Sequence, residues 1–305
     1  MKAAYVEAAG GPEQIRVGDL PAPEPRSDQL LVRNHAAGVG PWDWKALSGR
    51  WGELKFPHIP GAEAAGVVEQ APEGSRFSAG EEVWGRARHA YAEYIVSDGA
   101  ALVPKPVGLS FEDAAALVIS GATAHEGIID RLRLQPGETI VVTSAAGGVG
   151  SAAVQIAAST GARVIGICSA GSFDDVRALG AAEVFDYHDA GWTDAVRDVV
   201  PGGADALFDS AGAETGQTAL KALRDGARVS LVAYPMPDLS VEGRGISGEA
   251  FSAASTGATF AALGSLIEAG KLRSYATHVY PLEQAREALE ASQAGHTHGK
   301  IVLRT

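Results

Sequence analysis

A chain of 305 residues with 46% hydrophobic and 20% charged residues has the composition of an ordinary globular protein, and its length suggests about two domains. Lys and Arg total 25 against 37 Asp and Glu, which gives a formal net charge of −12; with no basic run, we expect no nucleic acid and no membrane as partners. The single cysteine, Cys168, excludes an intramolecular disulfide. Glu7 and the glycines after it interrupt the apolar run of a signal peptide, so we expect a cytoplasmic protein.

The first third of the chain predicts one strand after another. Short runs rich in Val, Ile, Leu and Tyr are separated every few residues by Gly, Pro or Asp, which is typical of a compact β-rich domain. We predict these strands at 3–6, 29–33, 64–68, 82–85 and 91–96.

From about Phe111, Ala-rich helical stretches alternate with short apolar strands. This alternation predicts a parallel sheet with helices on both faces. Within it, the uncharged run 139–162 is divided by Gly147 and Gly148, so we interpret it as strand, turn and helix and not as a membrane span. We predict strands at 140–143, 163–167, 183–185, 205–208 and 228–232, and helices at 151–159, 174–179 and 214–223.

The last part of the chain predicts two helices and a closing strand. The helices are expected at 260–268 and 282–292, and the strand at 300–303. No partner strand lies nearby in the sequence, so we expect the closing strand to return to the β-rich domain.

A glycine-rich turn lies between the first strand and the first helix of the alternating region. In the dinucleotide-binding fingerprint, glycines allow a tight turn, a close approach to the pyrophosphate and close packing of helix on strand. The helix N-terminus then offers free N–H groups to the phosphates. The alternative is a tight connection with no ligand. The turn consists of Ser144, Ala145, Ala146, Gly147, Gly148, Val149 and Gly150.

The second strand of this region bears on the choice of cofactor. An Asp or Glu about 20 residues after the glycines would bind the ribose 2′-hydroxyl of NAD, and none stands there. With the hydroxyls of Ser169 and Ser172 in its place, NADP(H) is favoured. The alternative is that Asp174 or Asp175, in the next helix, selects NAD.

Six stretches in this order resemble the medium-chain dehydrogenase/reductase superfamily, in its zinc-independent quinone oxidoreductase branch. The resemblance covers essentially the whole chain. The stretches are PGAEAAGVV at 60–68, YAEY at 91–94, GATA at 121–124, the glycine turn followed by SAAVQIA at 151–157, FDSAG at 208–212 and GKIVL at 299–303.

The resemblance implies an α/β fold of two domains. A GroES-like β-rich catalytic domain would comprise residues 1–116 and 266–305, and a Rossmann domain with a doubly wound parallel sheet, binding NADP(H), would comprise residues 117–265. It also implies a homodimer. Zinc-dependent relatives place Cys and His where this chain has Gly40 and Ala62, so no catalytic metal is expected. The pair His296 and His298 is expected to be an ordinary surface feature.

The implied chemistry is hydride transfer from the nicotinamide to an electrophilic acceptor, either a quinone or an α,β-unsaturated carbonyl. The protein would orient the substrate and donate a hydrogen bond to the developing enolate oxygen. One alternative is an enoyl or enone reductase dedicated to one biosynthetic pathway. Another is a non-catalytic NADPH-binding protein with a structural or sensor role.

For the substrate, the resemblance points to the loop beside the nicotinamide, where Gly40 replaces the asparagine of the family pattern. Trp42, Trp44 and Trp51 are candidates for the walls around a flat substrate, with packing as the alternative.

The candidate catalytic residues are Asp43, Lys45 and Tyr234. Lys45 or Tyr234 could hydrogen-bond the substrate carbonyl. The alternatives are a solvated or Asp43-paired Lys45, and an Asp43 that caps the following helical segment.

For the cofactor, the resemblance implies contacts along the ends of the Rossmann strands. Thr123 is expected at the nicotinamide, Ser144 to Gly150 at the pyrophosphate, Ser169, Ser172 and Tyr187 at the adenosine phosphate, and Ser210, Val232 and Ala233 at the ends of the later strands.

Overall fold

The computed structural model describes residues 1–49, 52–275, 278–295 and 297–305. Its contacts divide the chain into two units. Unit 1 comprises Met1–Ile119, Ser255–Glu268 and Ser274–Thr305, and unit 2 comprises Ser120–Ala254 and Ala269–Arg273.

Unit 2 is built on a six-stranded sheet in which every pairing is parallel. The order β10-β9-β8-β11-β12-β13 is the 3-2-1-4-5-6 order of doubly wound dinucleotide-binding sheets and confirms the predicted fold class. The direction of winding reverses between β8 and β11, where such sheets bind ligands at the carboxyl ends of the strands. The strands are β8 (Thr139–Thr143), β9 (Arg163–Cys168), β10 (Glu183–Asp186), β11 (Ala204–Asp209), β12 (Leu223–Leu231) and β13 (Ser247–Ala250).

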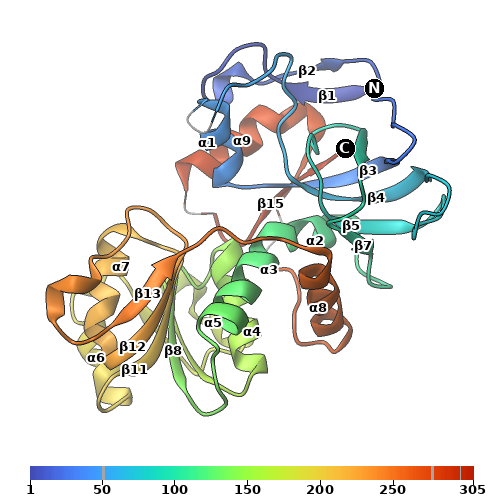
Figure 1. The fold of residues 1–305 in the computed structure, drawn as a ribbon. Coiled ribbons are helices and arrows are strands. Elements are labelled where there is room, and N and C mark those ends of the chain that lie inside the picture. The colour runs from blue at the N-terminus through green and yellow to red at the C-terminus, as the bar shows by residue number, and fades with distance from the viewer. Residues whose placement is uncertain (50–51, 276–277, 296) are drawn as a thin grey trace. The chain divides into compact units, whose positions relative to one another are not determined.

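The central strands of unit 2 are apolar along their length because helices cover both faces of the sheet (Figure 1). α3 (Val118–His125) runs into a π-helical turn at Glu126–Arg131. The crossover helices are α4 (Gly148–Ser159), α5 (Phe173–Ala178), α6 (Trp192–Val199) and α7 (Ala213–Ala219).

Unit 1 contains a seven-stranded sheet and a separate two-stranded sheet. β15 pairs antiparallel with β3, Ile301 lying opposite Val39, which confirms that the closing strand returns to the β-rich unit. The strands of the larger sheet are β3 (Leu30–Val39), β4 (Glu63–Gln70), β5 (Glu82–Arg86), β6 (Tyr94–Ser97), β7 (Leu102–Pro104), β14 (His278–Pro281) and β15 (Ile301–Arg304), and the smaller sheet pairs β1 (Lys2–Tyr5) with β2 (Arg16–Asp19).

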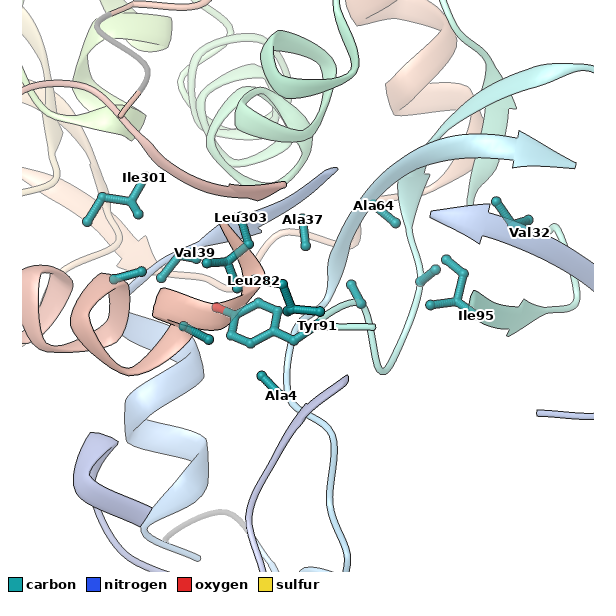
Figure 2. Close-up of a cluster of buried hydrophobic side chains, with 14 of the residues drawn as sticks. Ala4, Val32, Ala37, Val39, Ala64, Tyr91, Ile95, Leu282, Ile301 and Leu303 are labelled. Carbon is teal, nitrogen blue, oxygen red and sulfur yellow. The ribbon is translucent and has the colours of Figure 1, made fainter. Parts of the chain in front are cut away.

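The hydrophobic core of unit 1 joins segments from both ends of the chain. Figure 2 shows Ala4 and Tyr91 from the N-terminal part beside Leu282 and Leu303 from the C-terminal part. The helices of this unit are α1 (Pro41–Leu47), α2 (Phe111–Ala116), α8 (Gly257–Glu268) and α9 (Ala285–Ala294).

Helix α8 belongs to unit 1, although the sequence analysis assigns residues up to 265 to the cofactor domain. The ring of Phe260 on α8 is fully buried and meets Trp84 of β5 edge to face, with the ring centroids 5.5 Å apart. This aromatic contact with a distant strand decides the assignment, and nothing local in the sequence indicates it.

The helix predicted at 214–223 is shorter in the structure. α7 ends at Ala219, a 3₁₀ turn covers Leu220–Ala222, and Leu223 begins β12 because it pairs with Ala204 of β11. Strand pairing therefore overrides local helix propensity. In the described part of the chain, no helix combines the length and apolar character that spanning a bilayer requires.

Candidate active site

The glycine turn after β8 is shaped to leave a helix N-terminus open. Ser144 adopts a left-handed backbone conformation with φ of 50°, and the N–H of Gly147 donates to its carbonyl oxygen at 2.9 Å. Helix α4 begins at Gly148, and no side chain caps its N-terminus. Its first N–H groups are therefore available to an anion, as in a pyrophosphate-binding turn.

Gly150 is required by packing against this turn. A Cβ atom at this position would lie 2.0 Å from the Ser144 carbonyl oxygen, a distance that no side chain tolerates. The glycine thus lets α4 start directly against the end of β8. The geometry fits the pyrophosphate of a dinucleotide, and residues 144–150 are the ones that would hold it.

A buried hydrogen-bond network connects the end of β8 to the end of β11, the two strands between which the winding of the sheet reverses. Thr143 Oγ1 donates to Asp209 Oδ1 at 2.5 Å, and the same hydroxyl accepts the N–H of Ser210 at 3.0 Å. Ser210 Oγ in turn donates to the Thr143 carbonyl at 2.8 Å, and the N–H of Gly212 donates to the Asp209 carboxylate. The network holds the loop after β11 against the glycine turn after β8. Its buried members Thr143 and Asp209 were missed by the sequence analysis.

The other predicted cofactor residues lie on the same edge of the sheet, with Thr123 on α3. Val232 follows β12 and its N–H donates to the Asp209 carbonyl at 3.0 Å. Ala233 and Tyr234 come next, and Tyr234 is 71% exposed and precedes a cis peptide bond to Pro235. Unit 2 therefore gathers Ser210, Val232 and Ala233 next to the glycine turn.

A carboxylate that the sequence analysis missed lies at the strand ends where the adenosine phosphate is expected. Asp186 ends β10 directly beside Cys168, the last residue of β9. Its carboxylate accepts the backbone N–H of His188 at 2.9 Å, bonds the His188 ring at 2.7 Å and accepts the N–H of Ala170 at 3.1 Å. These hydrogen bonds, the backbone N–H of His188 first, lower the pKa of Asp186. The Tyr187 ring lies against His188, with the ring centroids 4.0 Å apart. This region therefore carries a negative charge, supplied by the neighbouring strand and not by the end of β9.

In unit 1, the predicted substrate loop is the start of helix α1. Asp43 caps this helix, as its alternative role in the sequence analysis states: from the first turn of α1 its Oδ2 accepts the N–H of Gly40, the residue before the helix, at 2.8 Å. Trp44 packs on the hydrophobic core, and Lys45 Nζ lies 5.2 Å from the centre of its ring. Trp42 is exposed to solvent over almost half of its surface, and Trp51 lies outside the described residues.

Four ionisable side chains meet beneath this loop. Glu63, 1% exposed, accepts Lys300 Nζ at 2.5 Å and the N–H of Ile119 at 2.8 Å. Asp43, 5% exposed, has its pKa raised to about 7, first by burial and then by the charge of Glu63. The fully buried Tyr91 hydroxyl lies next to Asp43, without a hydrogen bond of standard geometry to any described residue, and burial raises its pKa well above the usual range. We call these four residues the buried ionic cluster.

The sequence analysis singled out Asp43 from this cluster and missed the other three. The signals were present: Glu63 lies in the PGAEAAGVV stretch and Lys300 in the GKIVL stretch. Only the pairing of β15 with β3 shows that these stretches meet. Gly40 and Ala62 supply no metal donor, and among the described residues no group of three His, Cys, Asp or Glu side chains could hold a metal ion. His296 lies outside those residues.

Comparison with known proteins gives two family matches. Residues 26–107 match the family described as alcohol dehydrogenase GroES-like domain, and residues 179–303 match the family described as zinc-binding dehydrogenase.

Among curated proteins, the mouse quinone oxidoreductase is 32% identical over 99% of this chain and 97% of its own length. The human quinone oxidoreductase is 31% identical with the same coverage.

Among solved structures, an NAD-dependent alcohol dehydrogenase superposes with a TM-score of 0.93 at 32% identity, with complete coverage of both chains. The quinone oxidoreductase from Coxiella burnetii gives 0.89 at 26% identity, covering 100% of this chain and 99% of that one. A mycobacterial protein complexed with NADPH gives 0.87 at 28%, with both chains fully covered.

Proposed function

Since the chain belongs to the medium-chain dehydrogenase/reductase family, in its quinone oxidoreductase-like branch, we propose that it reduces a quinone or an α,β-unsaturated carbonyl with NADPH, without zinc. The observation that carries the proposal is the glycine turn at the switch point of the parallel sheet, where α4 presents an uncapped N-terminus. The nicotinamide cofactor supplies the hydride when bound. The chain's own residues bind the phosphates, orient the acceptor and stabilise the negative charge that develops on its oxygen.

The zinc-free part of the proposal is supported by the side chains around Gly40. A catalytic zinc needs about three protein ligands. Glycine and alanine stand at the two positions where zinc-dependent relatives have Cys and His, and the nearby Glu63 carboxylate is already bonded to Lys300 and to Ile119. Activity that is unchanged after extensive dialysis against a strong chelator is the expected result. A loss of activity that added zinc restores would contradict this part of the proposal.

NADPH is the proposed cofactor because no carboxylate ends β9, while Ser169 follows it with a hydroxyl. Asp186 acts against this preference, since its charge repels a 2′-phosphate, although the N–H of Ala170 and His188 already engage the carboxylate. We therefore expect Asp186→Asn to raise kcat/KM for NADPH relative to NADH. Asp174→Asn, at an exposed position on α5, is the comparison variant and is expected to leave that ratio unchanged. A ratio that responds to Asp174 and not to Asp186 would support the alternative in which α5 selects NAD.

The first experiment is anaerobic oxidation of NADPH followed by its absorbance, with a panel of quinones and a panel of enones in parallel and NADH as the second cofactor. Turnover on either panel is the expected result. Product analysis separates the alternatives, because a hydroquinone indicates a quinone reductase and a saturated carbonyl indicates an enone reductase. Tight NADPH binding without turnover on any acceptor would refute the proposed activity and favour a structural or sensor role.

Assembly and location complete the proposal. We propose a homodimer with a small-molecule substrate as its partner, in the cytoplasm. Light scattering coupled to size-exclusion chromatography tests the homodimer. The expected mass is twice the 31.3 kDa of one chain. A mass of one chain would refute it.

A further inference from the structure

Helix α1 is held against unit 1 by few buried side chains. Within this short helix, Asp43 and Leu47 are buried, while Pro41 and Trp42 at its start are exposed. α9 lies beside α1 (Figure 1), and its buried side chains are apolar and join Leu47 in the core of the unit. One of the two side chains that anchor α1 is therefore a carboxyl group.

The buried ionic cluster has two carboxyl groups for one ammonium group. Glu63 has the partners of an ionised carboxylate, because Lys300 Nζ bonds it at 2.5 Å and the N–H of Ile119 donates to it at 2.8 Å. For Asp43, the described residues supply one hydrogen bond of standard geometry, from the N–H of Gly40 at 2.8 Å. A buried charge without a partner is costly, so Asp43 is the member of the cluster that keeps a proton.

Asp43 is faced by charged or titratable groups from several segments of unit 1. Burial raises its pKa most, and the charge of Glu63 on β4 raises it further. The N–H of Gly40, the Lys300 ammonium before β15 and the Tyr91 hydroxyl favour the ionised form, yet the pKa is still raised to about 7. Asp43 therefore becomes a buried negative charge near neutral pH. On the adjacent α9, the charged residues are exposed: Arg286, Glu287 and Glu290.

Two other buried polar groups beside Asp43 lack partners. The indole Nε1 of Trp44 and the hydroxyl of Tyr91 form no hydrogen bond of standard geometry within the part of the chain that the structure describes. Trp44 packs on the core that contains Tyr91, and the Tyr91 hydroxyl lies next to Asp43. Unsatisfied buried groups of this kind raise the free energy of the docked state. Displacement of α1 from the core would bring water to all three groups at once.

The α1 side of the cluster is the side that can move. Glu63 begins β4, which is paired with β3 on one side and with β5 on the other, so its displacement would disrupt the sheet. The start of α1 is held by the Asp43 cap on Gly40, and its end by the N–H of Gly10, which donates to the Leu47 carbonyl at 2.9 Å. Segments with few buried apolar contacts open first in folded proteins. Ionised Asp43 thus reaches water most easily through release of α1.

We propose that α1 is a pH-sensitive switch, in which loss of the Asp43 proton to water releases the helix from the core of unit 1 and return of the proton docks it again. Trp42, Trp44 and Lys45 lie on α1, so its release moves all three of these candidate site residues. Every residue involved belongs to unit 1, and the switch does not depend on the proposed reductase activity.

Amide hydrogen exchange at pH 5, 6, 7 and 8, corrected for the intrinsic exchange rate at each pH, tests the switch. The carboxyl pKa is about 7 in the docked helix and 3.8, the ordinary value, once Asp43 is in water. The equilibrium constant for release therefore rises with pH and becomes level above pH 7, which amounts to at most about 100-fold between pH 5 and pH 8. Protection of the α1 amides should fall accordingly, and at pH 8 it should be about tenfold or more below that of the β4 amides.

Two variants and a matched control separate the proton from packing. Asp43→Asn does not titrate and keeps an acceptor for the N–H of Gly40, so protection of its α1 amides should not change with pH. Glu63→Gln leaves one carboxyl group facing Lys300, so ionised Asp43 is compensated and the pH dependence should shrink. Asp194→Asn is the control, because Asp194 is also the third residue of its helix, α6, but is exposed; its α1 amides should behave as in wild type.

Three results would overturn the proposal. If protection of the α1 amides in wild type changes by less than about threefold between pH 5 and pH 8, the proton does not control the helix. If Asp43→Asn keeps the wild-type pH dependence, another group controls it. If the α1 and β4 amides are equally protected at every pH, α1 is released only when the whole unit unfolds. The first and third results need the wild-type protein alone, so they decide the question even where a variant does not fold.

Discussion

Replacing Asp43 with Asn should stabilise the protein relative to wild type increasingly as the pH rises from acidic to neutral and alkaline values. The pKa of Asp43 rises from 3.8 to about 7 on folding, because the carboxyl group is buried beside Glu63. Between these two values the folded state holds a proton that the unfolded state has released. The free energy of unfolding therefore falls as pH rises through this window, by at most about 1.4 kcal/mol per pH unit, and becomes level above pH 7.

The full window corresponds to about 4 kcal/mol, and the part between pH 5 and pH 8 to about 3 kcal/mol. Asparagine does not titrate, and its amide oxygen can still accept the N–H of Gly40 that Asp43 binds at 2.8 Å. The difference in unfolding free energy, variant minus wild type, should thus grow by up to about 3 kcal/mol across this range. All other titrating groups are common to both proteins and cancel in this difference.

Urea unfolding at pH 5, 6, 7 and 8, followed by tryptophan fluorescence, measures this difference. Asp28→Asn is the control, because the Asp28 side chain is 74% exposed, and its difference from wild type should not change with pH. A difference for Asp43→Asn that is constant from pH 5 to pH 8 would refute the reasoning, since it would mean that Asp43 is ionised throughout.

Three further results are expected. Gly150→Ala should weaken NADPH binding at least tenfold and lower the Tm, since its Cβ would lie 2.0 Å from a backbone oxygen, whereas Gly191→Ala in the same unit, whose Cβ would lie at an ordinary 3.5 Å from Asp189, should change neither. Thr143→Val should cost about 1–3 kcal/mol in urea unfolding, because its hydroxyl joins Asp209 and Ser210; an unchanged midpoint would contradict the network. Cys168, buried and with its pKa raised to about 11, should react with iodoacetamide at pH 7.5 only after denaturation; rapid labelling of the native protein would contradict its burial.

The cofactor half of the candidate site could be predicted because its signals are local. The glycine turn, the strand before it and the helix after it occupy one continuous stretch, and the spacing of 147, 148 and 150 places the glycines at the helix start. Alternating apolar strands and Ala-rich helices likewise predict the parallel sheet. Asp186 was within reach as well, since it directly follows a predicted strand that neighbours β9 in such a sheet.

The buried ionic cluster could not be predicted from the sequence, because its members meet through pairing between distant segments. Lys300 precedes β15, Glu63 begins β4, and both strands pair with β3. Asp43 still caps α1 through the N–H of Gly40, but burial and the charge of Glu63 raise its pKa to about 7, so that its carboxyl group holds a proton near neutral pH. The composition of the chain and the spacing of its residues indicate neither which residues pair between β3, β4 and β15 nor how deeply Asp43 is buried.

The way the chain threads through unit 1 has a consequence for synthesis on the ribosome. β15 lies between β14 and β3 in the sheet, yet it is translated after the whole of unit 2. All six strands of unit 2 are translated before then. Until β15 arrives, β3 lacks a partner along 36–39, although β6 already pairs with it along 30–33, and Glu63 lacks its cation. A chain that stalls before residue 300 would therefore offer an open sheet edge to chaperones or to other chains. Insertion of β15 closes that edge and delivers Lys300 in the same event, which couples completion of the fold to completion of the site.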